Sequence, residues 1–191
     1  MVIEGLDGAG LSTQASMLRD YLHKNGKPTL LTKEPTDRTI GGLIKSSLKK
    51  EWRTSPVALQ LLFSADRAHH LSVEIEPALK DGIIVISDRY IFSTLAFGAL
   101  DVDMEFLKTL NSKFRKPDLT FILDVPPEVC LGRLLKDRYH LELFEVKEKF
   151  ENVRKNYLSL KDYFSNTYII NGNRTKEQVF ENIRKIIDKI I

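Results

Sequence analysis

A glycine-rich segment near the start of the chain has the residue types and spacing of a phosphate-binding loop. It reads Gly5-Leu6-Asp7-Gly8-Ala9-Gly10-Leu11-Ser12-Thr13 and lies between an apolar run and an amphipathic stretch. Backbone N–H groups must curl around phosphate oxygens there, and a Cβ atom would block that approach. The start of a helix adds further aligned donors. The segment therefore predicts a polyphosphate site at Gly5, Gly8, Ala9, Gly10, Leu11, Ser12 and Thr13, with the Ser12 hydroxyl on Mg²⁺.

The loop departs from the usual pattern at one position. In G-x-x-x-x-G-K-[ST] a lysine precedes the hydroxyl residue, but this chain has Leu11 there. That lysine normally places positive charge on the β- and γ-phosphates during phosphoryl transfer. Taken alone, the segment could therefore also be a plain glycine-rich turn between a strand and a helix.

The pattern of the remaining chain predicts the elements that would position such a loop. Short apolar runs alternate with helical patterns, which indicates a parallel α/β sheet. Strands are expected at residues 2–4, 29–32, 83–87, 119–124 and 167–170. Start and stop signals predict a first helix from residues 11–13 to Lys24, a helix over 55–68 and a last helix opening with the capping box Thr175-x-x-Gln178.

Composition bounds the class of protein. The 191 residues, 42% hydrophobic and 29% charged, fit one globular domain, residues 1–191, without repeats or linkers. A net charge of +3 is far below that of a nucleic-acid-binding stripe, and apolar runs such as 119–125 are too short to span a bilayer. We therefore expect neither a nucleic acid nor a membrane as partner. No signal peptide precedes the first strand, and the single Cys130, expected to be buried, favours the cytoplasm.

Five further segments, in order along nearly the whole chain, resemble the thymidylate kinase family. They are LLTKEP at 30–35, LLFSADR at 61–67, SDRY at 87–90, KPDLTFILDV at 116–125 and DRY at 137–139. The resemblance implies a three-layer P-loop NTPase fold like that of nucleoside monophosphate kinases, with a five-stranded parallel sheet flanked by helices. It further implies ATP as donor, thymidine monophosphate (dTMP) as acceptor, Mg²⁺ as cofactor and a homodimer.

Asp88 and Arg89 end an apolar strand, where open α/β sheets bind ligands. A carboxylate there can hold Mg²⁺, and a guanidinium can donate two N–H groups to one phosphate. An ordinary surface turn is the alternative interpretation. The resemblance implies that this pair serves the metal and the acceptor phosphate, and that Asp7 approaches the sugar hydroxyl and the metal.

The resemblance also implies an acceptor site. Phe63 and Arg67 share a helix face, the first to stack on thymine and the second to donate to its carbonyl. From periodicity alone, Phe63 would be a core residue and Arg67 an ion-pair partner. Phe97 would crowd the sugar and disfavour a 2′-hydroxyl. The dTMP-binding set is Asp7, Glu34, Pro35, Arg38, Phe63, Arg67, Arg89, Thr94, Phe97 and Tyr139.

A lid is expected at approximately residues 133–145, which are charged and lack periodicity. In family members with glycine inside the phosphate loop, as at Gly8, the lid supplies catalytic charge. Arg133 would then stack on adenine, and Lys136 and Arg138 would neutralise the transferred phosphoryl group. These two and Lys33 are the candidates to replace the missing loop lysine, with a lid cation favoured. An ordinary charged loop is the alternative.

Together these features predict in-line transfer of the γ-phosphate of Mg-ATP to dTMP, giving dTDP for dTTP biosynthesis. The predicted catalytic residues are Asp7, Asp88, Arg89, Lys136 and Arg138, and the predicted metal ligands are Ser12 and Asp88. One alternative is a degenerate nucleotide-binding sensor without turnover, which the missing lysine would suit. Another is a kinase of a different nucleoside or monophosphate.

Overall fold

The computed structural model describes residues 1–134 and 143–191, with side chains from residue 146 onward in the second range. Five strands form one sheet in the order β2-β3-β1-β4-β5, and every pair of neighbours is parallel. The strands are β1 (Val2–Gly5), β2 (Thr29–Lys33), β3 (Ile84–Asp88), β4 (Thr120–Asp124) and β5 (Thr167–Asn171). All five lie where the apolar runs predicted them.

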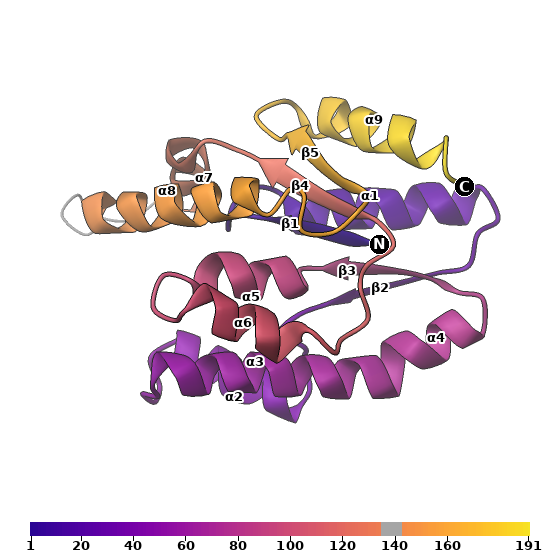
Figure 1. The fold of residues 1–191 in the computed structure, drawn as a ribbon. Helices are drawn as coiled ribbons and strands as arrows, with labels where there is room; N and C mark the ends of the chain where they lie inside the picture. Colours follow the sequence, from indigo (N-terminus) through magenta and orange to yellow (C-terminus); the bar gives the residue numbers. More distant parts are fainter. Residues whose placement is uncertain (135–142) are drawn as a thin grey trace.

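Helices cover both faces of this sheet (Figure 1). Helices α1 (Leu11–Lys24) and α9 (Lys176–Ile187) pack together on one face. The other elements are α2 (Thr39–Leu48), α3 (Pro56–His70), the π-helical turn η1 (Leu71–Ile75), α4 (Glu76–Lys80), α5 (Ile91–Gly98), α6 (Met104–Asn111), α7 (Pro127–Leu134) and α8 (Leu143–Ser159). The predicted α/β class, a five-stranded parallel sheet flanked by helices, is confirmed.

Local signals in the sequence account for the helix ends. Helix α1 ends at Lys24, before the Gly26 and Pro28 that cannot continue it. The Ser55 hydroxyl accepts a hydrogen bond from the Ala58 N–H at the start of α3. At the start of α9, Thr175 and Gln178 form the complete capping box. The three predicted helices are therefore confirmed, with boundaries shifted by at most two residues.

The hydrophobic core lies between the sheet and its helices. Ile3, Ile86 and Phe121, from the three central strands, are fully buried. Cys130 on α7 is also buried, as expected, and burial raises the pKa of its thiol to about 11. Within the described ranges, no helix combines the length and apolar character needed to cross a bilayer.

The parallel register determines which residues meet at the carboxyl edge of the sheet. Asp88 at the end of β3 pairs with Ile3 of β1 on one side and with Lys33 of β2 on the other. Gly5 at the end of β1 pairs with Leu123 of β4. Because all strands run in one direction, the phosphate loop that follows Gly5 and the acidic end of β3 lie at the same edge.

Candidate active site

Three glycines give the loop between β1 and α1 its shape. Gly5, Gly8 and Gly10 have φ values of 149°, 80° and 97°, in the region that side chains rarely adopt. A Cβ on Gly5 would lie 2.8 Å from the Leu123 carbonyl oxygen, and one on Gly8 would lie 2.7 Å from the Cys130 carbonyl oxygen. Neither position could therefore hold a larger residue without moving backbone. The loop thus has the compact backbone that a phosphate site requires.

Leu11, which occupies the lysine position, turns away from solvent. Its side chain is 6% exposed and belongs to the hydrophobic core. Its Cδ2 atom lies 3.3 Å from where a Cβ on Gly5 would be. The residue therefore packs beneath the loop, and a positive charge above the loop must come from another element.

Ser12 and Asp88 are brought together as predicted for a metal site. The first turn of α1 carries Ser12, whose hydroxyl donates to Asp88 Oδ2 at 2.5 Å. A hydroxyl and a carboxylate are hard oxygen ligands that suit Mg²⁺. Among the described residues no cluster of three or more acidic, histidine or cysteine side chains could hold a metal. A Mg²⁺ ion here would thus take its remaining ligands from phosphate and water, as this ion commonly does.

A cleft of about 550 Å³ opens beside this pair. Arg38, at the start of α2, lies in its wall with a 48% exposed side chain and an ion pair of 3.2 Å to Glu74. The cleft is lined by Ser12, Ala15, Leu31, Thr32, Lys33, Thr36, Asp37, Arg38, Glu74 and Asp88. It therefore joins the predicted metal ligands to one predicted acceptor-binding arginine.

Arg89 connects the end of β3 to the phosphate loop. Its backbone is in the left-handed region, with φ of 74°. Its Nη1 donates to the Gly5 carbonyl oxygen at 3.0 Å, and its Nη2 donates to Asp7 Oδ1 at 2.5 Å. The Phe97 ring lies 5.3 Å from its guanidinium carbon. The structure thus brings together Asp7, Arg89 and Phe97, three of the residues expected at the acceptor site.

Beneath Arg89 lies a buried carboxylate that the sequence analysis missed. Glu4 is 1% exposed and accepts hydrogen bonds from the Tyr90 N–H at 2.9 Å and the Ser93 hydroxyl at 2.6 Å. The Tyr157 hydroxyl, from α8, lies 3.3 Å from both Glu4 Oε2 and Arg89 Nη1. We call Glu4, Asp7, Arg89, Ser93 and Tyr157 the Arg89 cluster.

Electrostatics within the Arg89 cluster follow from burial and charge. Burial raises the pKa of Glu4, and the Ser93 hydrogen bond and the Arg89 charge only partly offset it. For Arg89, burial lowers the pKa, but the surrounding Tyr157, Asp7 and Glu4 outweigh it and the net shift is upward. Arg89 therefore remains positively charged at neutral pH and can hold an anion.

The raised pKa of Glu4 predicts a pH-dependent stability. Above its ordinary value of 4.5, the unfolded chain has lost the Glu4 proton while the folded state still retains it. The free energy of unfolding should therefore fall as the pH rises from 4.5 towards the folded-state pKa. Urea unfolding of wild type and Glu4→Gln across this window measures the effect, because the difference between the two curves isolates Glu4. Parallel curves would contradict the prediction.

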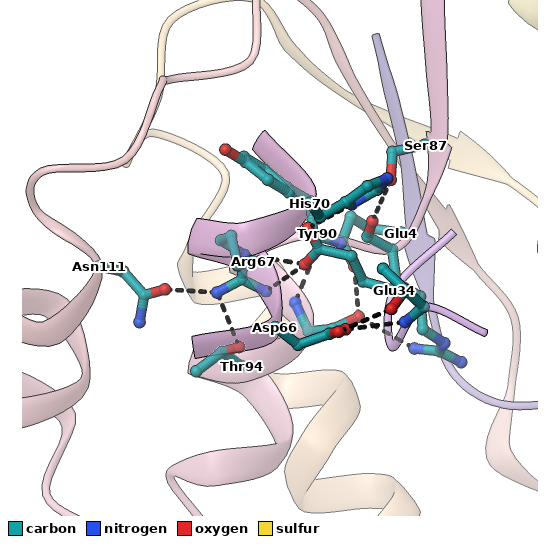
Figure 2. Close-up of polar contacts among 12 residues, drawn as sticks. Glu4, Glu34, Asp66, Arg67, His70, Ser87, Tyr90, Thr94 and Asn111 are labelled. Atoms are coloured by element: carbon teal, nitrogen blue, oxygen red, sulfur yellow. Dashed lines mark hydrogen bonds and ion pairs between the residues drawn. The ribbon is translucent and has the colours of Figure 1, made fainter. Parts of the chain in front are cut away.

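A second buried network holds Arg67 of α3 (Figure 2). The Arg67 side chain is 1% exposed, and its Nε and Nη2 lie 2.9 and 2.8 Å from Glu34 Oε2. Its Nη1 donates to Thr94 Oγ1 at 3.1 Å and also to Asn111 Oδ1. We call Glu34, Arg67, His70, Thr94 and Asn111 the Arg67 network. Contacts with Glu34, Thr94 and Asn111 hold the Arg67 guanidinium in one orientation.

His70 and Asp66 tie α3 to the segment after β2. The His70 ring nitrogens lie 3.1 Å from Glu34 Oε1 and 2.8 Å from Thr32 Oγ1. Asp66 accepts from the Thr36 N–H and hydroxyl, both at 2.7 Å. These contacts place Pro35, next to Glu34, in a segment that is fixed from both ends.

Comparison with known proteins decides the family. The model of the family described as thymidylate kinase matches residues 3–183, nearly the whole chain. The chain belongs to the thymidylate kinase family. It is therefore a kinase with a P-loop, and the resemblance read from the sequence motifs is confirmed.

Several curated relatives agree with the thymidylate kinase family. A probable thymidylate kinase of Thermococcus kodakarensis is 38% identical, and the alignment covers 100% of this chain and 98% of the relative. One of Thermococcus onnurineus is 40% identical, covering 98% and 96%. Probable thymidylate kinase 1 of Saccharolobus solfataricus is 39% identical, covering 99% and 96%. The similarity thus extends over nearly the full length of this chain and of each relative.

The residues expected to bind the acceptor base of a thymidylate kinase occupy two environments. Phe63 on α3 is half-buried and retains exposed surface. Glu34, Arg67 and Thr94 are instead at most 5% exposed, and Arg67 already has three partners. The ion-pair interpretation of Arg67 therefore describes its contacts in this structure. Any contact with a base would involve a guanidinium that is already fixed in place.

The lid expected of a thymidylate kinase falls largely outside the described residues. Arg133, at the end of α7, donates from Nη1 to the Gly8 carbonyl oxygen at 3.0 Å. It thus lies against the phosphate loop, on the side of α7. Lys136, Arg138 and Tyr139 lie outside the described residues.

Proposed function

We propose that this chain transfers the γ-phosphate of Mg-ATP in line to the phosphate of dTMP, through the residues assigned below. One observation carries the assignment. The glycine loop, the Ser12–Asp88 pair and the Arg89–Asp7 pair lie at one edge of the sheet, linked by contacts of 2.5 to 3.0 Å. A donor polyphosphate, a cation and an acceptor phosphate need these three features side by side.

The donor would be held mainly by backbone. The N–H groups of the loop and of the first turn of α1 present aligned donors to the β- and γ-phosphates. Arg133, fixed on Gly8, would lie at the adenine end of ATP. Ser12 and Asp88 would hold Mg²⁺, which neutralises charge on the phosphates when bound. The protein then contributes position and charge, which is most of what phosphoryl transfer requires.

The acceptor would be held by arginines and aromatic rings. Arg89, with Arg38 across the cleft, would bind the acceptor phosphate, and Asp7 would face the sugar hydroxyl. Phe97, already packed on Arg89, would crowd a 2′-hydroxyl. Phe63 would stack on thymine beside the segment Glu34-Pro35, with Arg67, Thr94 and Tyr139 completing the base site. Lys136 and Arg138 would neutralise the transferred group.

An acceptor panel tests this proposal. ADP release from Mg-ATP is measured with thymidine, uridine and adenosine monophosphates and with unphosphorylated thymidine. Turnover that is highest with dTMP is expected, because the acceptor needs a phosphate for Arg89, a base carbonyl that adenine lacks, and no 2′-hydroxyl against Phe97. Binding of ATP without turnover on any acceptor would favour the sensor, and preference for another acceptor would favour a different kinase.

We also propose a homodimer in the cytoplasm. Helices α2 and α3 and their connection expose large apolar side chains, namely Leu43, Leu48, Trp52, Val57 and Leu61, with exposed fractions of 37 to 56%. Burying such a face against a second copy would remove it from water. Light scattering should give about twice the 21.9 kDa chain mass. Leu61→Glu should shift this mass to the monomer, and an unchanged mass would argue against this face. Cys130, a free thiol, supports the cytoplasmic assignment, because a reducing compartment keeps thiols free.

A further inference from the structure

Lys33 lies beside Asp88 at the edge of the sheet that carries the phosphate loop. It ends β2, and its backbone pairs with that of Asp88, the predicted metal ligand at the end of β3. It lines the same cleft as Ser12 and Asp88, and its side chain is 53% exposed. The same cleft is therefore lined by a hydroxyl residue from α1 (Ser12), a carboxylate residue from β3 (Asp88) and an ammonium residue from β2 (Lys33).

The ammonium group of Lys33 is only weakly held. Its contact in the described structure is Asp37 at 3.0 Å, and the two side chains are 53% and 73% exposed. Exposed ion pairs of this kind contribute little to stability, because water and salt screen them. Asp37 is also contacted by Lys45 from α2. Lys33 can thus leave this carboxylate for a phosphate oxygen without leaving a buried charge unpaired.

The described arginines near the phosphate loop and the cleft contact other groups. Arg89 is 17% exposed and contacts Gly5, Asp7 and Ser93. Arg38 pairs with Glu74 on the side of the cleft formed by η1. Arg133 lies over Gly8. Among these four, Lys33 is the one that both pairs with Asp88 in the sheet and lines the cleft with Ser12.

We propose that Lys33 supplies the positive charge that a loop lysine supplies in the usual pattern, by contacting donor phosphate oxygens beside Ser12 and Asp88. This inference rests on the proposed function, since it assumes that ATP is the donor. It explains how Leu11 can remain packed in the core while the donor phosphates still meet an ammonium group. The role is electrostatic, and no proton is transferred.

The test compares Lys33→Met with Lys45→Met. Lys45 pairs with the same Asp37 and also donates to the Thr36 carbonyl oxygen at 2.7 Å, but it does not line the cleft, so its replacement controls for the loss of an Asp37 ion pair. We expect Lys33→Met to lower kcat/KM for ATP about a hundredfold and to weaken Mg-ATP binding in calorimetry about tenfold, with KM for dTMP unchanged. Lys33→Arg should keep most of the affinity, and Lys45→Met should behave as wild type.

Two results would overturn the role of Lys33. One is a Lys33→Met protein whose ATP affinity and turnover match those of Lys45→Met. The other is a rise of about a hundredfold in turnover for Leu11→Lys in the wild-type background, which would show that no side chain fills the role. Failure of the proposed function is a different outcome: wild type would show no turnover on dTMP, while calorimetry with Mg-ATP would still compare the Lys33 and Lys45 variants.

Discussion

An Arg89→Met protein is expected to lose kcat/KM for dTMP on the order of a thousandfold. Arg89 is the charged donor at the point where the phosphate loop, β3 and the acceptor would meet, and it is 17% exposed. Charge-assisted hydrogen bonds from a guanidinium to a phosphate are strong, and a water-poor site strengthens them further. Steady-state kinetics with dTMP varied at saturating Mg-ATP measure the loss.

Two companion variants make the Arg89 result specific. Arg19→Met removes an exposed arginine on α1 that pairs only with its neighbour Asp20 among the described acidic residues, so its activity should match wild type. Arg89→Lys keeps the charge but loses the geometry of two N–H groups, and should recover only part of the rate. An Arg89→Met protein that is folded by circular dichroism and still turns over within about tenfold of wild type would contradict the assignment of Arg89 to the acceptor phosphate.

Arg67→Met is expected to have the largest effect on stability, lowering the free energy of unfolding by about 3–5 kcal/mol. The Arg67 side chain is 1% exposed and the Glu34 side chain 3% exposed. Removing the guanidinium would leave the Glu34 carboxylate buried without its main counter-charge, and Thr94 and Asn111 without their donor. Urea unfolding at neutral pH measures the change.

A double-mutant cycle separates the loss of the pair from the loss of one partner. Arg67→Met with Glu34→Met removes both charges, and should be less destabilised than the sum of the two single variants. Arg115→Met provides the control, because its side chain is 44% exposed and its ion pairs are long, at 3.7 and 3.9 Å. Additive losses in the cycle would mean that Glu34 and Arg67 do not act as a pair.

The sequence predicted the sheet and the phosphate loop well because their signals are local. Uninterrupted apolar runs identify the buried parallel strands, and the capping residues Ser55 and Thr175 mark helix starts. The glycine spacing of the loop reflects backbone conformations that larger residues cannot adopt, as at Gly8. The juxtaposition of Ser12 and Asp88 also followed, since parallel strands end at a common edge.

The sequence predicted the buried polar networks poorly because their partners are distant along the chain. Glu4 contacts Ser93 and Tyr157, which lie 89 and 153 residues away. Tyr157 has the helical spacing of a core residue beside Val153 and Leu160, so its hydroxyl gave no signal. Glu4 itself did give a signal in the sequence. It is a charged residue inside a buried apolar strand, and such a residue generally has a polar partner.

The attachment of α8 restricts how this protein can be recombined with its relatives. Arg154 holds Asp124 through two contacts of 2.6 and 3.0 Å, and Asn156 donates to the Ala96 carbonyl oxygen at 2.9 Å. The neighbouring Tyr157 reaches Arg89, the arginine proposed to hold the acceptor phosphate. A chimera that exchanges the chain after residue 142 would therefore combine α8 of one parent with Asp124, Ala96 and Arg89 of the other, and these contacts could be lost. A chimera should therefore take the end of β4, α5 and α8 from the same parent protein.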